Sequence, residues 1–267
     1  MRLKTISIVI PALNEEKGIG PVLREIPIKE LKTMGYNVEV LVIDNGSHDQ
    51  TPHIARKNGA KVIIQPIRGY GNAYKAGFAN AHGDIIATGD ADLTYPFCIL
   101  PEAIKKMEKE NVDFINTDRL STLNKEVMEG SHVFGNKLLS FGTKVLFRLP
   151  FKDSQSGMWI FKRQIWFHLN VHSSGMPFSQ ELKIEAHVRG FKCAEMPIDY
   201  RARAGEVKLN TITDGIGNIL HLLKKRYQIG LRVAKADVKK IEEEWVPMNE
   251  RSDAEKREKG WETAAAR

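Results

Sequence analysis

Short runs of apolar and β-branched residues alternate with amphipathic segments of helical period through the first two hundred residues of the chain. The runs that predict buried strands are residues 5–10, 38–43, 61–65, 85–89, 112–117, 157–161 and 192–198. Continuous hydrophobicity of this kind is typical of parallel strands that are covered on both faces. Helical spacing follows most of them, so the pattern predicts an α/β fold with a doubly wound sheet.

The pattern also predicts how the chain is divided. We expect residues 1–210 to form one catalytic domain. Residues 211–234 carry an amphipathic helical segment. Residues 235–267 are rich in Lys and Glu and poor in large apolar side chains. Such a composition indicates a solvated helix or a partly disordered tail.

Polar side chains follow the predicted strands at their carboxyl ends, where ligands bind in open α/β sheets. The fourth strand delivers Asp90 and Asp92 to this edge with one residue between them. Side chains two apart in an extended segment point the same way, so a cation or solvent must offset the repulsion of the carboxylates. The pair predicts a Mg²⁺ or Mn²⁺ ion holding a diphosphate. A polar strand exit that caps the next helix would show the same pattern.

A glycine pair after the third strand, Gly69 and Gly71, partly matches a dinucleotide-binding fingerprint. It follows the wrong strand and lacks the third glycine, which disfavours that interpretation. Farther along, the loop 200–208 is rich in Arg and Lys and could close over phosphates. A solvated surface loop would have the same composition.

Residues 132–149 form a predicted helix that places Phe134, Leu138, Leu139, Phe141, Val145, Leu146 and Leu149 on one arc, bordered by Lys137, Lys144 and Arg148. A basic rim beside an apolar face is typical of a helix in a membrane interface. An ordinary core-facing helix with a solvated basic edge fits the segment equally well.

Composition narrows the class of protein without naming an activity. Apolar residues make up 42% and charged residues 27%, as in a soluble globular protein. The net charge of +7 favours an acidic partner such as a nucleotide phosphate, an anionic lipid or a nucleic acid. Cys98 and Cys193 lack metal-ligand spacing, which predicts buried thiols. We find no signal peptide and no long apolar run, and therefore expect a cytoplasmic protein.

Taken in order, these motifs resemble the inverting family 2 glycosyltransferases with the GT-A fold, particularly the dolichyl- and polyprenyl-phosphate sugar synthases. The resemblance spans residues 6–209, and the matching segments are 11–15, 43–51, 69–73, 90–92, Arg119, 153–157 and the pair Arg203 and Lys208. It implies a mostly parallel central sheet with helices on both faces and a hexosyltransferase activity.

The resemblance also implies which residues bind the ligands. For the nucleotide sugar (GDP-mannose, UDP-glucose or UDP-GlcNAc) they are Pro11, Leu13, Glu15, Ile43, Asp44, Asn45, Asp90, Ala91, Arg119, Arg203 and Lys208. Asp90 and Asp92 would hold Mg²⁺ or Mn²⁺, which assists departure of the nucleotide, and Arg203 and Lys208 would share that task.

The sequence departs from the family pattern in four motifs. Asn45 stands where members usually have a second aspartate, and Thr94 replaces a glutamine that follows the metal motif. Met158 and Trp159 stand where members usually have an aromatic residue and then an arginine after the acceptor-side Ser-Gly, and Val207 replaces a serine before the lysine of the cationic loop. These departures leave the identity of the sugar open.

The acceptor decides whether a base is needed. A lipid phosphate is already ionised at neutral pH, whereas a sugar hydroxyl needs a carboxylate to take its proton, for which Asp153 and Glu181 are the candidates. A turn residue and a carboxylate at a helix start are equally good explanations of these two residues.

The amphipathic segments favour a dolichyl or polyprenyl phosphate at the cytoplasmic face of a membrane, with the tail as a possible docking arm for a protein partner. A soluble sugar or metabolite acceptor is the alternative. A non-catalytic nucleotide-sugar-binding protein of a membrane complex is another, and nucleic-acid binding has no supporting motif.

Overall fold

The computed structural model describes residues 3–122, 130–204 and 217–231. Contacts divide the chain into two units, of which the first ends at Leu222 and the second begins at Leu223. The fold and the candidate site lie in the first unit. Of the second unit, only the helical residues 223–231 are described.

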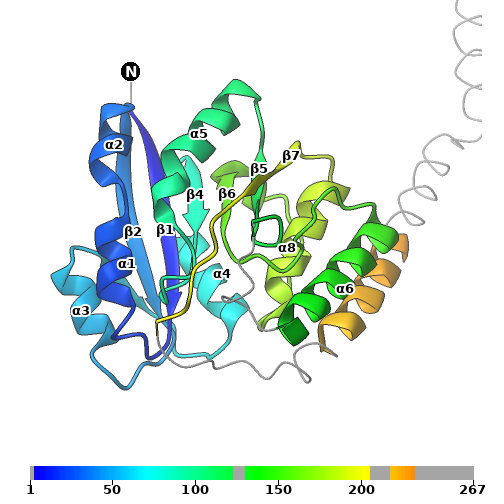
Figure 1. Cartoon of the computed structure of the whole chain (residues 1–267), viewed down its shortest axis with the longest axis horizontal. Helices are drawn as coiled ribbons and strands as arrows, with labels where there is room; N and C mark the ends of the chain where they lie inside the picture. Colours follow the sequence, from blue (N-terminus) through cyan, green and yellow to red (C-terminus); the bar gives the residue numbers. More distant parts are fainter. Residues whose placement is uncertain (1–2, 123–129, 205–216, 232–267) are drawn as a thin grey trace, which may run out of the picture. The chain divides into compact units, whose positions relative to one another are not determined.

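A seven-stranded sheet forms the centre of the first unit (Figure 1). Its order is β3-β2-β1-β4-β6-β5-β7. The strands are β1 Lys4–Ala12, β2 Tyr36–Asp44, β3 Lys61–Ile64, β4 Ile85–Thr88, β5 Phe114–Asp118, β6 Trp159–Lys162 and β7 Cys193–Pro197. All neighbouring pairs are parallel except those of β6, which runs antiparallel to both β4 and β5. The sheet is therefore mostly parallel, as expected.

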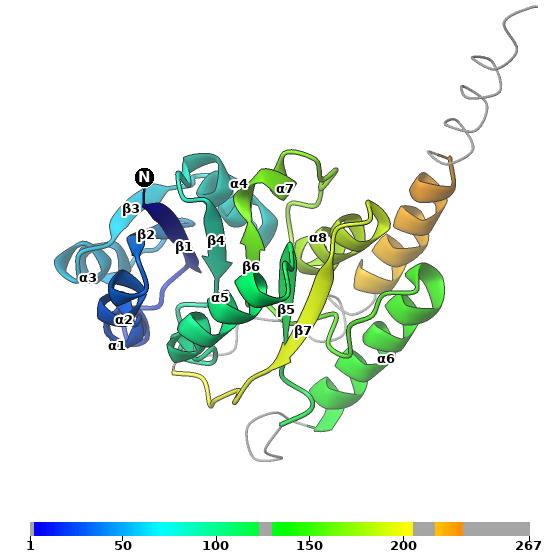
Figure 2. The same ribbon diagram turned by 90° about the horizontal axis from the view of Figure 1, so that it is seen from above.

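Helices cover both faces of this sheet. They are α1 Ile19–Glu25, α2 Ile28–Thr33, α3 Thr51–Lys57, α4 Tyr70–Asn80, α5 Leu100–Lys109, α6 Gly130–Phe147, α7 Arg163–Trp166 and α8 Pro177–Val188. Figure 2 shows α1, α2 and α5 on one face and α4, α7 and α8 on the other. Proline lies in the first turn of α3, α5 and α8, where its missing N–H costs no helical hydrogen bond.

Two cores hold the helices to the sheet. On one face, branched aliphatic residues of β1 pack against those of α1 and α5. On the other face the packing is aromatic: Tyr74 lies 5.0 Å from Trp159 and 5.7 Å from Phe178, ring centre to ring centre. The strands are thus buried on both faces, and close packing holds both layers of helices in fixed positions on the sheet.

The structure differs from the sequence-based expectation in several places. The short helices α2 and α7 were not predicted, and α4 begins at Tyr70, so Gly71 lies inside a helix and not in a loop before it. Cys98 is exposed, contrary to the predicted buried thiol, whereas Cys193 is partly buried. Short helices carry too few residues for a periodic signal, which explains why pattern alone missed them.

The largest difference concerns α6. Leu139 and Phe147 are buried, whereas Leu138, Phe141 and Val145 are 52%, 65% and 61% exposed. The predicted single apolar arc is therefore wrong: the apolar residues are split between two faces. The hydroxyl groups of Ser140 and Thr143 are buried on the inner face, so part of the core contact of this helix is polar.

Candidate active site

Polar turns meet at the carboxyl edge of the sheet and enclose a cavity of 230 Å³. Parallel register places Ala12 at the end of β1 beside Asp44 at the end of β2, so the turns that follow are neighbours. The residues that line the cavity are Pro11, Ala12, Leu13, Glu15, Asn45, Arg68, Gly69, Tyr70, Ala73, Asp90, Ala91, Asp92, Met176 and Arg203. We use the name donor edge for residues 11–16, 44–51 and 90–92.

Most of the residues expected to bind the nucleotide sugar lie at this cavity. Ile43 and Asp44 are buried in β2 beside it and do not line it. Arg119 is also buried outside its lining, and Lys208 lies outside the described residues. The roles assigned to these residues stay predictions.

The two aspartates after β4 have different surroundings. One oxygen of Asp92 accepts hydrogen bonds from the backbone N–H and the hydroxyl of Thr94, at 3.1 and 2.5 Å. The other lies 2.6 Å from the Arg203 guanidinium. Burial and the charge of Asp92 raise the pKa of Asp90 to about 7, while Arg203 and Arg119 oppose the shift. Holding both aspartates in the ionised form therefore costs free energy.

These residues fit a divalent cation. Two carboxylates in one place are the donor set that a hard cation takes, and a bound cation would remove the repulsion that raises the pKa of Asp90. The hydroxyl of Thr94 already bonds Asp92. Among the described residues, no group of three or more His, Cys, Asp or Glu side chains is arranged to hold a metal ion. Diphosphate oxygens and waters would have to complete the coordination.

The turns after β1 and β2 are linked by direct hydrogen bonds. The Thr51 and Ser47 hydroxyl groups accept the backbone N–H groups of Glu15 and Asn14, at 2.7 and 3.0 Å. In return, the Asn14 side chain accepts the N–H of His48 at 2.8 Å. Asn14 has a φ of 51°, a conformation that asparagine tolerates better than most residues. The first two turns of the donor edge thus form one unit.

Asn45, the departure from the family pattern, joins a third segment to this unit. Its amide nitrogen donates to the backbone oxygens of Gln65 and Ile67, at 2.9 Å each, and its amide oxygen accepts the N–H of Gly69 at 2.8 Å. A carboxylate could not donate to the two carbonyls. The structure therefore explains the asparagine as a clamp on the segment that leads into α4.

The glycine pair at the start of α4 has a packing explanation. A Cβ atom on Gly69 would lie 2.4 Å from the Ser174 carbonyl oxygen, and one on Gly71 would lie 2.4 Å from that of Ser173. The segment before α8 therefore approaches the backbone of α4 closely and brings Met176 to the cavity wall. Close backbone packing, and not dinucleotide binding, accounts for the spacing.

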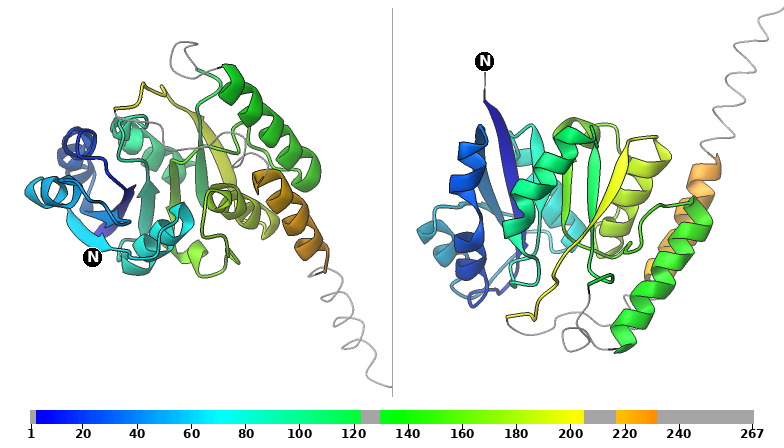
Figure 3. Two further views of the ribbon diagram at one scale, coloured as in Figure 1. Left: turned by 90° about the horizontal axis from the view of Figure 1, so that it is seen from below. Right: turned by 45° about the horizontal axis from the view of Figure 1, so that its top comes forward.

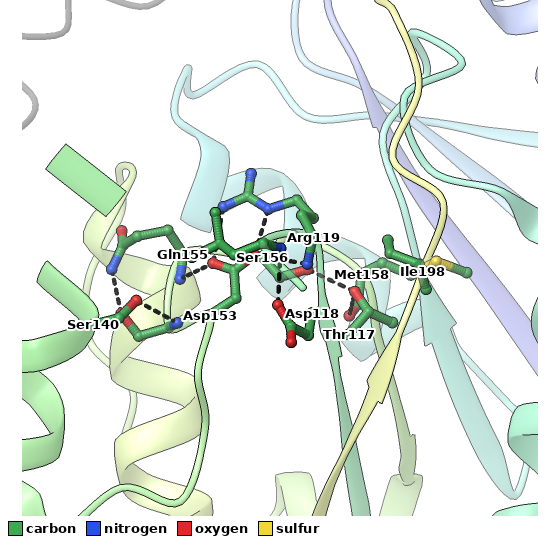
Figure 4. A network of polar contacts seen from close by, with 12 residues as sticks. Thr117, Asp118, Arg119, Ser140, Asp153, Gln155, Ser156, Met158 and Ile198 are labelled. Carbon is green, nitrogen blue, oxygen red and sulfur yellow. Dashed lines mark hydrogen bonds and ion pairs between the residues drawn. The ribbon is translucent and has the colours of Figure 1, made fainter. Parts of the chain in front are cut away.

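Arg119 and Asp153 form a buried ion pair (Figure 4). Two guanidinium nitrogens donate to the two carboxylate oxygens, at 2.7 and 3.0 Å. Burial alone would raise the pKa of Asp153, but the charge and hydrogen bonds of Arg119 outweigh it and lower the pKa. A carboxylate held in its ionised form is a weak proton acceptor. We use the name acceptor-motif turn for residues 153–157.

Glu181, the other candidate base, is 1% exposed. Its carboxylate accepts the backbone N–H groups of His172 and Ser173, at 3.1 and 2.8 Å, and so fixes the segment that carries Met176. A catalytic role for Glu181 stays a prediction. The contacts that the structure shows are those of a residue that positions the cavity wall.

The cationic loop after β7 reaches the metal motif across the carboxyl ends of the strands (Figure 3). The backbone N–H groups of Arg201 and Ala204 donate to the carbonyl oxygens of Thr94 and Asp92, at 3.1 and 2.8 Å. Arg203 is thereby held beside Asp92. That the loop closes over phosphates stays a prediction, and residues 205–208 lie outside the described part of the chain.

Sequence reasoning missed several residues at the site. Tyr70 and Met176 line the cavity, and Tyr95 lies next to the acceptor-motif turn, where its hydroxyl accepts the N–H of Gly157 at 2.6 Å. Lys183 is buried beneath that turn. Nothing in the local pattern marks Lys183, because a lysine in an amphipathic helix is ordinarily expected in solvent.

The mostly parallel seven-stranded sheet with one antiparallel strand has the GT-A fold of structurally similar glycosyltransferases. The family model described as "Glycosyl transferase family 2" matches residues 7–167. The chain belongs to this family and is a glycosyltransferase.

Two relatives come from Haloferax volcanii. "Low-salt glycan biosynthesis hexosyltransferase Agl6" is 37% identical over 82% of this chain, which spans only 53% of that protein. "Dolichyl-phosphate hexose transferase" is 34% identical over 79% of this chain and 89% of its own length. A solved structure, glucosyl-3-phosphoglycerate synthase from Mycobacterium tuberculosis with Mn²⁺, UDP and glucosyl-3-phosphoglycerate, shares the fold. It has a TM-score of 0.65 at 22% identity and covers 84% of this chain and 80% of its own.

Proposed function

We propose that this protein transfers a hexose, with inversion, from a nucleotide-diphosphate sugar to a dolichyl or polyprenyl phosphate. The observation that carries the proposal is the state of the two candidate bases. Asp153 is held ionised by Arg119, and Glu181 accepts two backbone N–H groups. A phosphate acceptor needs neither, because its oxygen is already ionised at neutral pH. The relative named as a dolichyl-phosphate hexose transferase supports the same acceptor.

The donor would lie across the donor edge, with its base and ribose near Pro11, Glu15 and Asp44 and its diphosphate at Asp90 and Asp92. Mg²⁺ or Mn²⁺ held there would neutralise charge on the departing nucleotide. Arg203, 2.6 Å from Asp92, adds positive charge at the same place. The acceptor oxygen then attacks the anomeric carbon from the face opposite the diphosphate, which inverts that carbon.

The outer face of α6 supports a membrane-bound acceptor. Leu138, Phe141 and Val145 are exposed at helical spacing, with exposed Lys137 and Lys144 beside them. Apolar residues bordered by lysines suit a surface of anionic lipid. In the second unit, Leu223, Tyr227 and Leu231 are also exposed at a spacing of four. None of the described helices is long and apolar enough to cross a bilayer.

As part of the proposal, the enzyme binds peripherally to the cytoplasmic face of a membrane. The proposed protein partner of the tail concerns residues outside the described part of the chain. A soluble acceptor is the second candidate, because the structurally similar synthase carries glucosyl-3-phosphoglycerate. The third candidate, a non-catalytic binding protein, predicts donor binding without turnover.

The test is transfer of radiolabel from GDP- and UDP-hexoses into an organic phase that contains dolichyl or polyprenyl phosphate, with Mg²⁺ or Mn²⁺ present. Asp92→Asn is the matched control, since it keeps the size of the side chain and removes its charge. Label in the lipid that is lost in the variant supports the proposal. Nucleotide release only with soluble sugars or phosphorylated metabolites contradicts it, as does tight donor binding without any transfer.

A further inference from the structure

The feature that the proposed mechanism leaves unused is the buried ammonium group of Lys183 on α8. The residue has no exposed surface. Its nitrogen lies 2.7 Å from the Ser154 carbonyl oxygen, 2.6 Å from that of Ser156 and 3.2 Å from the Ser179 hydroxyl. All three are neutral oxygens. Burying a charge against neutral groups is expensive, so packing alone gives no reason for a lysine here.

The Ser156 carbonyl is the focus of this cluster. It accepts three hydrogen bonds, from Lys183 at 2.6 Å, from the Trp159 indole at 2.7 Å and from the Ser179 hydroxyl at 2.9 Å. A carbonyl oxygen has two lone pairs, so three donors hold it strongly in one direction. The peptide that joins Ser156 to Gly157 is fixed with its oxygen toward α8.

The opposite side of that peptide faces the proposed metal site. The Gly157 N–H donates to the Tyr95 hydroxyl at 2.6 Å. A Cβ atom on Gly157 would lie 2.7 Å from the Tyr70 hydroxyl oxygen and 3.5 Å from an oxygen of Asp90. Any movement of Gly157 in that direction would therefore displace the Tyr70 hydroxyl.

We propose that Lys183 is a positioning residue for sugar transfer. Its charged form holds the acceptor-motif turn against α8, and this fixes Gly157 and the two tyrosines beside Asp90 in the arrangement that admits the acceptor. The residue itself touches no substrate. The inference rests on the proposed function only in taking the acceptor-motif turn as the place where the acceptor binds.

The electrostatics around Lys183 make its charge state variable near neutral pH. Burial and the charge of Arg119 lower its pKa to about 7, against the opposing charges of Asp153 and Glu195. The Trp159 ring lies 5.6 Å from the ammonium nitrogen. When neutral, the amine has only two N–H groups and cannot donate to all three oxygens.

Activity and stability should then respond to pH in opposite directions. An unfolded lysine has a pKa of about 10.4, so between about pH 7 and pH 10 the unfolded chain holds up to one more proton than the folded chain at this position. The contribution of Lys183 to the free energy of unfolding therefore rises with pH in that window. Turnover should fall in the same window, because the charged form is the positioning form. A merely structural lysine would show the same change in stability and leave kcat unchanged.

The experiment compares the full-length protein with Lys183→Met and with Lys105→Met, an exposed lysine on α5. We would measure kcat between pH 6 and 8.5, and donor affinity by titration of the Mn²⁺-loaded nucleotide sugar. Lys183→Met should lower kcat roughly tenfold to a hundredfold, leave donor affinity within about twofold and lack the alkaline decline. Ser179→Ala should keep that decline, since the ammonium group stays in place. Lys105→Met should match the unchanged protein.

A Lys183→Met variant with normal kcat, or one that loses donor affinity and kcat in proportion, would overturn the inference. If that variant does not fold, the unchanged protein still decides it: kcat constant from pH 6 to 8.5 contradicts the proposal. Label found only in a soluble acceptor refutes the lipid proposal. The kcat values of the variants are then compared with that soluble acceptor, which tests the role of Lys183 separately. Absence of turnover with every acceptor refutes both.

Discussion

The donor edge and the acceptor-motif turn differ in how their charges are balanced. At the donor edge, turns are joined by neutral hydrogen bonds such as those of Asn45 and Thr51, while the aspartate pair is left with excess negative charge. At the acceptor-motif turn, the charges of Arg119 and Asp153 compensate each other inside the protein. The first arrangement suits a ligand that brings its own cation, and the second suits a rigid support.

The largest effect should come from the donor edge. Asp92→Asn removes a carboxylate from the proposed metal site and the partner of Arg203, so kcat should fall on the order of 10³-fold. Chelation of divalent metal should abolish transfer as well, and Mn²⁺ should restore it in the unchanged protein. Full activity after chelation would contradict a metal role for the aspartates.

Arg119→Met tests the acceptor-motif turn. It leaves Asp153 buried without its ion partner, which should lower the free energy of unfolding by about 3 to 5 kcal/mol, as measured by urea denaturation. The double variant Arg119→Met with Asp153→Asn should recover part of this loss. Lys106→Gln, which removes a surface pair with Glu110, should change stability far less, because solvent screens the exposed charges. Equal losses at both pairs would show that burial does not distinguish them.

Asn45→Asp probes the neutral linkage of the donor edge. The carboxylate would face the carbonyl oxygens of Gln65 and Ile67, so the variant should lose about 2 kcal/mol of stability and raise the KM for the donor. Asn58→Asp at the C-cap of α3 is the matched control, since it loses one hydrogen bond from the side-chain amide to the Ile54 carbonyl oxygen, away from the cavity. An unchanged donor KM in the first variant would mean that the clamp does not shape the cavity.

The smallest effect should come from the outer face of α6. Phe141→Ser removes exposed apolar surface and should weaken binding to anionic phospholipid vesicles roughly tenfold in a sedimentation assay. Ile64→Ser, at a residue on β3 that is equally exposed, is the control and should leave binding unchanged. Equal binding by both variants would remove the support that α6 gives to a membrane-bound acceptor.

Much of the fold was predictable because its signals are local. Apolar runs mark β1, β2 and β4, and the polar residues after them fall at the same sheet edge through parallel register. Pattern could not show that β6 runs antiparallel, because an apolar run of four residues has no direction. It also placed Leu138 and Leu139 of α6 together, since only tertiary packing decides which of two neighbouring faces is covered.

The sequence by itself determined the class of fold, the family and the aspartate pair at the carboxyl edge. Only the tertiary structure showed that Arg119 is paired with Asp153, that Asn45 clamps the Gly69 segment and that Lys183 holds the Ser156 carbonyl. The reason is physical. These roles depend on contacts between residues far apart in the chain. The sequence does not show whether a polar side chain is hydrated by solvent or hydrogen-bonded to a buried group.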